Sequence, residues 1–221
     1  MNFVFCYYRP ENRFPNRVFG RSAQSIGDPQ GCSRDTFSYF HFRNASLPGA
    51  KLPPPWRLVT AGREDLLALQ AVYMAKSGGL MLKALELEPD ADRMCDLEAQ
   101  YARFGLKRAR SIYALKKGNN VKAILMLNIA DPGLNLSELT NSLTLMVLDP
   151  ADLTKEILYT ALAMQTEKSE LMATPVLLYP DAFAEAAGMP REKSYTLWVM
   201  NMQYTDQYLK FIHKLLGRFD R

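Results

Sequence analysis

Hydrophobic and polar positions follow two different periods along this chain, and these periods predict its elements. From residue 56 to residue 200 they predict a strand, two helices, three strands, a helix, a strand, a short helix and a strand. The segment Leu143–Leu148 is nearly all apolar, as expected of a central strand that is buried on both faces. We therefore predict that this strand lies in the middle of a sheet, parallel to a strand at Val176–Tyr179.

Two amphipathic helices are predicted in the second half of the chain. The first covers Ala151–Thr166 and lies between the two parallel strands. The second covers Thr205–Leu216, and its spacing predicts that Tyr208, Ile212 and Leu215 point inward.

The N-terminal segment differs from the rest of the chain in its sequence pattern. Aromatic strands are predicted at Phe3–Tyr8 and at Asp35–Phe42, with a short helix between them. We expect both strands to join a sheet, because their aromatic faces need to be buried. The proline-rich stretch Leu47–Pro55 is typical of an extended linker. We therefore predict an N-terminal segment over residues 1–50 and a main domain over residues 56–221.

Composition narrows the class of protein. A chain of 221 residues that is 48% hydrophobic can bury a substantial core. The net charge of +4 comes from scattered basic residues and not from a basic stripe, so no nucleic-acid partner is expected. Three widely spaced cysteines and two histidines predict neither a disulfide framework nor a metal site. No apolar run is long enough to span a membrane, and we expect a cytoplasmic protein with no membrane partner.

The order of predicted elements resembles that of the acyl-CoA N-acyltransferase (GNAT) superfamily over about residues 56–202. The sharpest local likeness is the segment Tyr179–Met189, a helix that ends in glycine, followed by a returning strand at Lys193–Trp198. The resemblance implies an α+β fold of three α/β-type layers, with a mixed central sheet flanked by helices. The N-terminal strand–helix–strand order repeats that of residues 176–200, so residues 1–50 are a candidate for the tail of a first GNAT-like unit.

The resemblance also implies where a cofactor would lie. In that family, pantetheine pairs with the exposed backbone of the strand before the central helix, and the pyrophosphate lies on the N-terminus of that helix. The matching positions here are Met146, Val147 and Leu148 for pantetheine and Ala151, Asp152 and Leu153 for pyrophosphate. Acyl-CoA is therefore the possible cofactor, although no cofactor is firmly predicted.

The turn after the central strand departs from the family pattern. Pro-Ala-Asp-Leu-Thr follows Asp149, where the family has a glycine-rich loop. Pro150 has no N–H to donate, and Asp149 and Asp152 place negative charge where phosphates would lie. Asp152 is a candidate cap for its own helix. These residues favour an ordinary helix cap over a phosphate cradle.

Two further features are candidates for a cleft. Tyr179 ends a strand near the position of the family's general acid, where a phenol could return a proton to a leaving thiolate. The alternative is a tyrosine at the edge of the core. The polar loop from Asp131 to Asn141 carries Asn135, Ser137 and Asn141, which line a cleft or cap a local turn.

A second pattern points to a different ligand. Arg17-x-x-x-Arg21 and, later, Asn44-x-Ser46-x-x-Gly49 resemble the two signatures of PilZ domains, which bind cyclic di-GMP. Patterns this short also arise by chance.

Three functions therefore remain open. The favoured one is a GNAT-like module that binds a small ligand or another domain of a longer protein. The others are an acyl-CoA-dependent N-acyltransferase and a cyclic di-GMP-responsive regulator.

Overall fold

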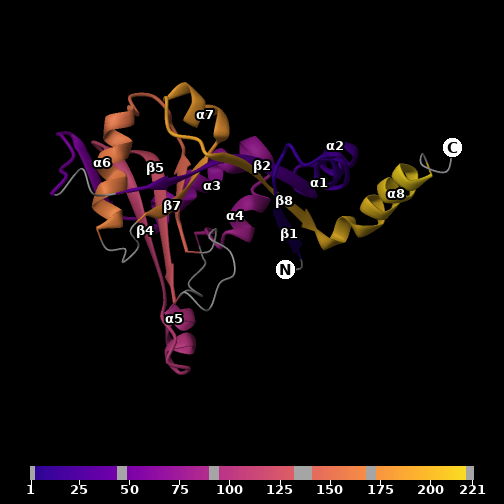
Figure 1. Ribbon diagram of the computed structural model, residues 1–221, viewed down its shortest axis with the longest axis horizontal. Coiled ribbons are helices and arrows are strands. Elements are labelled where there is room, and N and C mark those ends of the chain that lie inside the picture. The colour runs from indigo at the N-terminus through magenta and orange to yellow at the C-terminus, as the bar shows by residue number, and fades with distance from the viewer. Residues whose placement is uncertain (1–2, 44–48, 90–94, 132–140, 168–172, 218–221) are drawn as a thin grey trace. The chain divides into compact units, whose positions relative to one another are not determined.

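The computed structural model describes residues 3–43, 49–89, 95–131, 141–167 and 173–217. Eight strands form a mixed sheet in the order β1-β8-β2-β7-β6-β5-β4-β3 (Figure 1). The strands are β1 (Phe3–Tyr8), β2 (Cys32–Phe42), β3 (Trp56–Thr60), β4 (Arg108–Lys117), β5 (Asn120–Ala130), β6 (Leu143–Val147), β7 (Thr174–Tyr179) and β8 (Lys193–Asn201).

The helices occupy the segments between these strands. They are α1 (Arg13–Pro15), the π-helix η1 (Asn16–Gly20), α2 (Arg21–Ile26), α3 (Arg63–Ser77), α4 (Leu80–Ala84), α5 (Cys95–Ala102), α6 (Lys155–Thr166), α7 (Asp181–Ala186), the 3₁₀-helix η5 (Met202–Tyr204) and α8 (Thr205–Leu216).

The described residues form two compact units. The first takes its residues from Met1–Thr36, Gln70–Glu88 and Ser194–Arg221, and the second from Phe37–Leu69 and Pro89–Lys193. The division falls within β2, α3 and β8, whereas the sequence predicted a boundary in the linker before Trp56. The predicted segments 1–50 and 56–221 stay a prediction.

The second unit holds the larger core. Strands β3 to β6 form an antiparallel meander, and β6 and β7 are parallel, with Leu143 opposite Val176. All five side chains of β6 are buried, which confirms the predicted central strand. The apolar face of α6 packs on this sheet through Ile157, Leu158, Ala161 and Leu162.

Helices lie on both faces of this sheet. On β4, Leu115 belongs to the cluster packed under α6, and its neighbour Lys116 points to the opposite face because side chains alternate along a strand. There the Lys116 ammonium meets Asp65 of α3 at 2.6 Å. The result is the predicted three-layer α+β arrangement, with α6 on one face and the start of α3 on the other.

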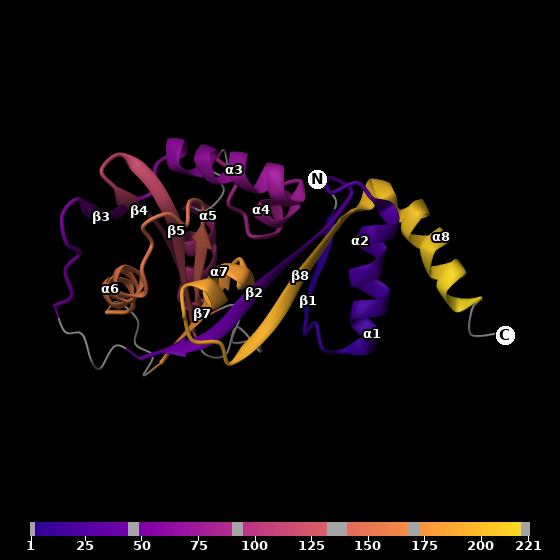
Figure 2. The same cartoon turned by 90° about the horizontal axis from the view of Figure 1, so that it is seen from above.

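The first unit is built around aromatic side chains. Strand β1 pairs with β8 in antiparallel register, with Phe3 opposite Asn201. Figure 2 shows α1 and α2 beside these two strands. The Phe19 ring of η1 lies 4.9 Å from the Trp198 ring, and the Trp198 indole N–H donates to Ser22. Both predicted N-terminal strands therefore join the sheet, as their aromatic content indicated.

Helix α8 has the predicted bounds, and the three residues predicted to point inward lie on its less exposed face. Tyr208, Ile212 and Leu215 are only half-buried, and none of the residues of α8 is fully buried. Tyr208 nevertheless faces the core of the first unit, as predicted, because its ring packs on that core with the centroid 5.7 Å from that of Trp198. The apolar face of α8 lines an open groove.

Candidate functional site

The turn at residues 149–153 is closed by hydrogen bonds between its own residues. The N–H of Ala151 donates to the Asp149 carboxylate at 2.9 Å, and the N–H of Leu153 donates to the carbonyl of Pro150 at 3.2 Å. Asp152 has a left-handed backbone with φ +65°, and Leu153 is buried. Two of the N–H groups that a pyrophosphate would need are therefore already engaged within the turn.

Two lysines neutralise the carboxylates of this turn. The Lys122 ammonium is buried and pairs with the Asp149 carboxylate, 3.9 Å from the carboxylate of Asp152. The ammonium of Lys117 lies 3.0 Å from the Asp152 carboxylate. The hydrogen bond from Lys122 lowers the pKa of Asp149 below its ordinary value. Both lysines therefore already have a carboxylate partner within the chain.

A β-bulge brings Lys122 into this position. Leu115 of β4 pairs with Ala123 and Lys116 pairs with Val121, so Lys122 is the extra residue of β5. A bulge leaves one residue outside the regular ladder and re-aims its side chain. The carbonyl of Lys122 accepts the N–H groups of both Leu148 and Asp149, at 2.9 and 3.2 Å. The bulge and the turn therefore form one hydrogen-bonded assembly.

Helix α6 begins four residues later than the sequence predicted. Its N-cap is Thr154, whose hydroxyl accepts the N–H of Ile157 at 3.4 Å, and Asp152 lies outside the helix. The prediction that Asp152 caps this helix is therefore wrong, because its left-handed backbone cannot lead into a helical turn there. Ala151 and Leu153, the other pyrophosphate candidates, also precede the helix.

The pantetheine candidates are engaged in the sheet. Met146 pairs with Tyr179 of β7, and Val147 pairs with Ala123 of β5. The N–H of Leu148 is bonded to β5 through Lys122. The parallel register of β6 and β7 continues to the last residue of β7. The backbone that pantetheine would pair with is therefore already engaged by neighbouring strands, and the turn that follows it does not fit a CoA pyrophosphate.

Tyr179 lies in the interior of the second unit. Its side chain has no exposed surface, and its ring packs on Phe37 with the centroids 4.6 Å apart. Tyr179 is therefore a core tyrosine and lies deeper than the edge of the core, which was the alternative expected from the sequence. Its role as a general acid stays a prediction.

The candidate cleft loop is described only at its end. The side-chain amide of Asn141 donates to the carbonyl of Ala130, the last residue of β5, at 3.2 Å. Asn135 and Ser137 lie outside the described residues.

The PilZ-like pattern is divided between different kinds of structure. Arg17 lies in η1 and Arg21 begins α2. Asn44 and Ser46 lie outside the described residues, and residues 49–55 form no strand. A PilZ domain needs its second signature to open a strand, so the structure offers that interpretation no support.

Polar clusters appear that sequence reasoning missed. The imidazole of His41 lies between the Glu192 carboxylate, at 2.9 Å, and the Tyr39 hydroxyl, at 3.2 Å. Ser38 donates a hydrogen bond to Asp181 of α7. In the first unit, Oδ2 of Asp35 and the hydroxyl of Tyr73 are buried, and neither has a hydrogen-bond partner among the described residues. The alternation of β2 was an available signal only for Tyr39 and His41, since it places them on one face of the strand.

The strand order, the parallel β6–α6–β7 unit and the late α7–β8 segment define a GNAT-like fold. No protein-family model matches the chain, and neither does any curated protein.

Several solved structures are similar at low identity. A protein from Drosophila is 14% identical, with a TM-score of 0.46, and the match covers 87% of this chain. A GCN5-related N-acetyltransferase from Kribbella flavida is also 14% identical, with a TM-score of 0.38 over 77% of this chain. Another from Anabaena variabilis is 9% identical, with a TM-score of 0.36 over 88% of this chain. The chain spans 59%, 60% and 45% of the lengths of these three proteins.

The described residues offer neither a metal site nor a membrane-spanning helix. No group of three or more histidine, cysteine, aspartate or glutamate side chains there is placed to hold a metal ion. None of the helices in the described ranges is long and apolar enough to cross a bilayer.

Proposed function

We propose that this chain is a GNAT-like domain that works as a binding or structural module and not as an acyl-CoA-dependent transferase. The observation that carries the proposal is the turn at 149–153, whose donors and charges are satisfied internally. Its expected partners are a small ligand or another domain of a longer protein.

The number of free N–H donors and the sign of the local charge both disfavour a phosphate at this turn. A pyrophosphate is held by several free N–H groups at the start of a helix, together with the positive end of the helix dipole. Here Pro150 has no N–H, and the N–H groups of Ala151 and Leu153 are engaged. The carboxylates of Asp149 and Asp152 would face the phosphates at close range and repel them.

Calorimetric titration with CoA and with acetyl-CoA tests this proposal. We expect no measurable heat of binding at ligand concentrations up to about 1 mM, which corresponds to a binding free energy weaker than about −4 kcal/mol. Release of free thiol from acetyl-CoA, measured with a panel of amines, should equal the rate without protein. Micromolar affinity or turnover above that rate would make the acyltransferase alternative correct.

A double variant tests the reason as well as the result. Asp149→Ala with Asp152→Gly removes both carboxylates, frees the N–H of Ala151 and leaves Lys117 and Lys122 available to phosphate. We expect this variant to bind CoA at least tenfold more tightly than the wild type, provided that circular dichroism shows it folded. Asp206→Asn, an exposed aspartate of α8, is the matched control and should leave CoA binding unchanged. Equal affinity of the double variant and the wild type would contradict the charge argument.

A further inference from the structure

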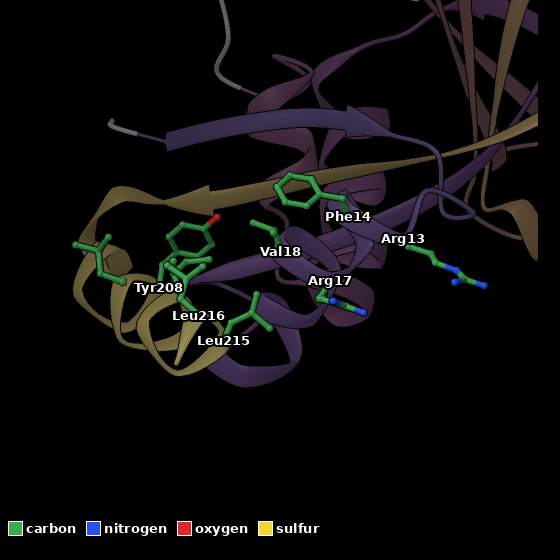
Figure 3. A pocket seen from close by; sticks show the side chains of 9 residues that line it. Arg13, Phe14, Arg17, Val18, Tyr208, Leu215 and Leu216 are labelled. Carbon is green, nitrogen blue, oxygen red and sulfur yellow. The ribbon is translucent and has the colours of Figure 1, made fainter. Parts of the chain in front are cut away.

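The first unit contains an apolar groove between α8 and the helical segment formed by α1 and η1. Its volume is about 630 Å³, within the range typical of small-molecule sites. Figure 3 shows the lining side chains as sticks. The apolar part is formed by Phe14 and Val18 on one side and by Leu209, Ile212, Leu215 and Leu216 on the other.

These apolar side chains are unusually open to solvent. Phe14 is 72% exposed, Leu216 is 55% exposed and Leu209 is 47% exposed. On α8 they recur at helical spacing from Tyr208 to Leu216, which makes a continuous strip about 12 Å long at 1.5 Å per residue. A strip of this shape is complementary to a single extended alkyl chain.

The charged lining residues are all of one sign. Among the residues that the structure describes, the charged side chains that line the groove are Arg13 and Arg17. Figure 3 shows both side chains extending away from the α8 side chains. The groove therefore joins an apolar strip to two guanidinium groups, and guanidinium groups bind carboxylates through paired hydrogen bonds.

We propose that this groove binds one long-chain acyl carboxylate. The alkyl chain covers the apolar strip of α8 between Leu209 and Leu216, and the carboxylate pairs with Arg13 and Arg17. A small amphipathic anion satisfies both features of the groove, because its apolar length and its charge lie at opposite ends of one molecule. This site is separate from the turn at 149–153, so its test does not depend on whether CoA binds there.

Calorimetric titration with tetradecanoate, kept below its micelle concentration, tests the proposal. We expect one molecule bound per chain, with a dissociation constant in the micromolar range. Octanoate, which covers less of the strip, should bind at least tenfold more weakly. Tetradecanol keeps the chain but lacks the charge, and it should also bind at least tenfold more weakly.

Variants separate the groove from general attraction to a basic surface. Arg13→Glu with Arg17→Glu should weaken tetradecanoate binding at least tenfold. Arg21→Glu is the matched control, since Arg21 is exposed and follows at the same spacing but does not line the groove. It should change the dissociation constant less than twofold. Leu209→Asp, at an exposed position, should abolish binding without unfolding the chain.

Four results would overturn the proposal. They are no binding of tetradecanoate at 200 µM, many bound molecules per chain, and equal weakening by Arg21→Glu and by the double variant. The fourth is dimerisation of the free protein that Leu209→Asp abolishes, which would assign the groove to a second copy of the chain.

Discussion

The stability of the first unit should depend on whether the carboxyl group of Asp35 is protonated. Its Oδ2 atom is buried without a hydrogen-bond partner among the described residues, near the equally buried hydroxyl of Tyr73. Burial raises the pKa of Asp35 from 3.8 to about 6, although a hydrogen bond from Ser77 and the charge of Lys76 oppose this rise. Burial, with the nearby charge of Asp35, also raises the pKa of Tyr73.

The direction of the pH effect follows from the raised pKa. A carboxyl that holds its proton more tightly when folded stabilises the fold at low pH, and this contribution is lost as pH rises from about 4 to about 6. One pKa unit corresponds to about 1.4 kcal/mol, so the rise from 3.8 to about 6 corresponds to about 3 kcal/mol. Above pH 6 the charged Asp35, whose Oδ2 atom is buried, therefore destabilises the chain by up to an amount of this order relative to low pH.

Asp35→Asn removes the charge and keeps the shape. We expect the variant to be more stable than the wild type by about 1–3 kcal/mol at pH 7.5, and the difference to vanish near pH 4. The lower bound allows for the new amide donors, which also need partners. Urea unfolding at pH 4, 5, 6 and 7.5 measures the difference, with Asp206→Asn as the exposed control.

The reasoning about Asp35 would be refuted by a constant difference between Asp35→Asn and the wild type across this pH range. A variant less stable than the wild type at pH 7.5 would also refute it. Comparing the two proteins cancels the opposite pH dependence of carboxyls with lowered pKa values, such as Asp28 and Glu192.

Two further stability predictions concern a close backbone approach and a buried charge. Gly78→Ala should destabilise the chain by more than about 2 kcal/mol in urea unfolding, because its Cβ would lie 2.3 Å from the carbonyl oxygen of Pro29 and φ is +70°. Gly118→Ala, with φ +62° and nothing within 4 Å, should cost only about 1 kcal/mol, and equal losses would contradict the close approach. Asp149→Ala should cost about 2 kcal/mol and Lys122→Met less than about 1 kcal/mol, because only the first leaves a buried ammonium without its close partner, with the Asp152 carboxylate remaining at 3.9 Å. The reverse order in thermal unfolding would contradict this.

Local pattern was enough to predict most elements of the fold. Strand β1 has the predicted bounds Phe3–Tyr8, and α8 has the predicted bounds Thr205–Leu216. In β6 an unbroken apolar run indicated burial on both faces, and every residue of the strand is buried. These predictions succeeded because side-chain period depends on the element itself and on little else.

The start of α6 could not be predicted in the same way. The turn at 149–153 is shaped by Lys122, which is 27 residues away from Asp149 and reaches it because of a bulge in another strand. None of the residues next to Asp152 in the sequence indicates that its backbone is left-handed. Thr154 was the available signal, since a threonine before a periodic apolar run is a common helix cap.

Polar sites far apart in the sequence were harder still. His41 meets Glu192 across 151 residues, and Ser38 meets Asp181 across 143. Such contacts depend on which strands become neighbours, and the position of β2 between β8 and β7 has no local signal. The groove beside α8 was missed for a related reason, because helical spacing identifies an apolar face but does not say what covers it.

The turn at 149–153 should still limit CoA binding after both of its carboxylates have been removed. Removing Asp149 and Asp152 would free the N–H of Ala151 and two ammonium groups, but Pro150 would still lack a donor. The N–H of Leu153 would still be bonded to the Pro150 carbonyl, and α6 would still begin after Thr154. Any gain in CoA affinity should therefore come from charge and be lost at high salt, because salt screens the attraction between ammonium groups and phosphates much more than it weakens hydrogen bonds from backbone donors. Persistence of the gain at 1 M salt would show that the turn had refolded into a true phosphate cradle.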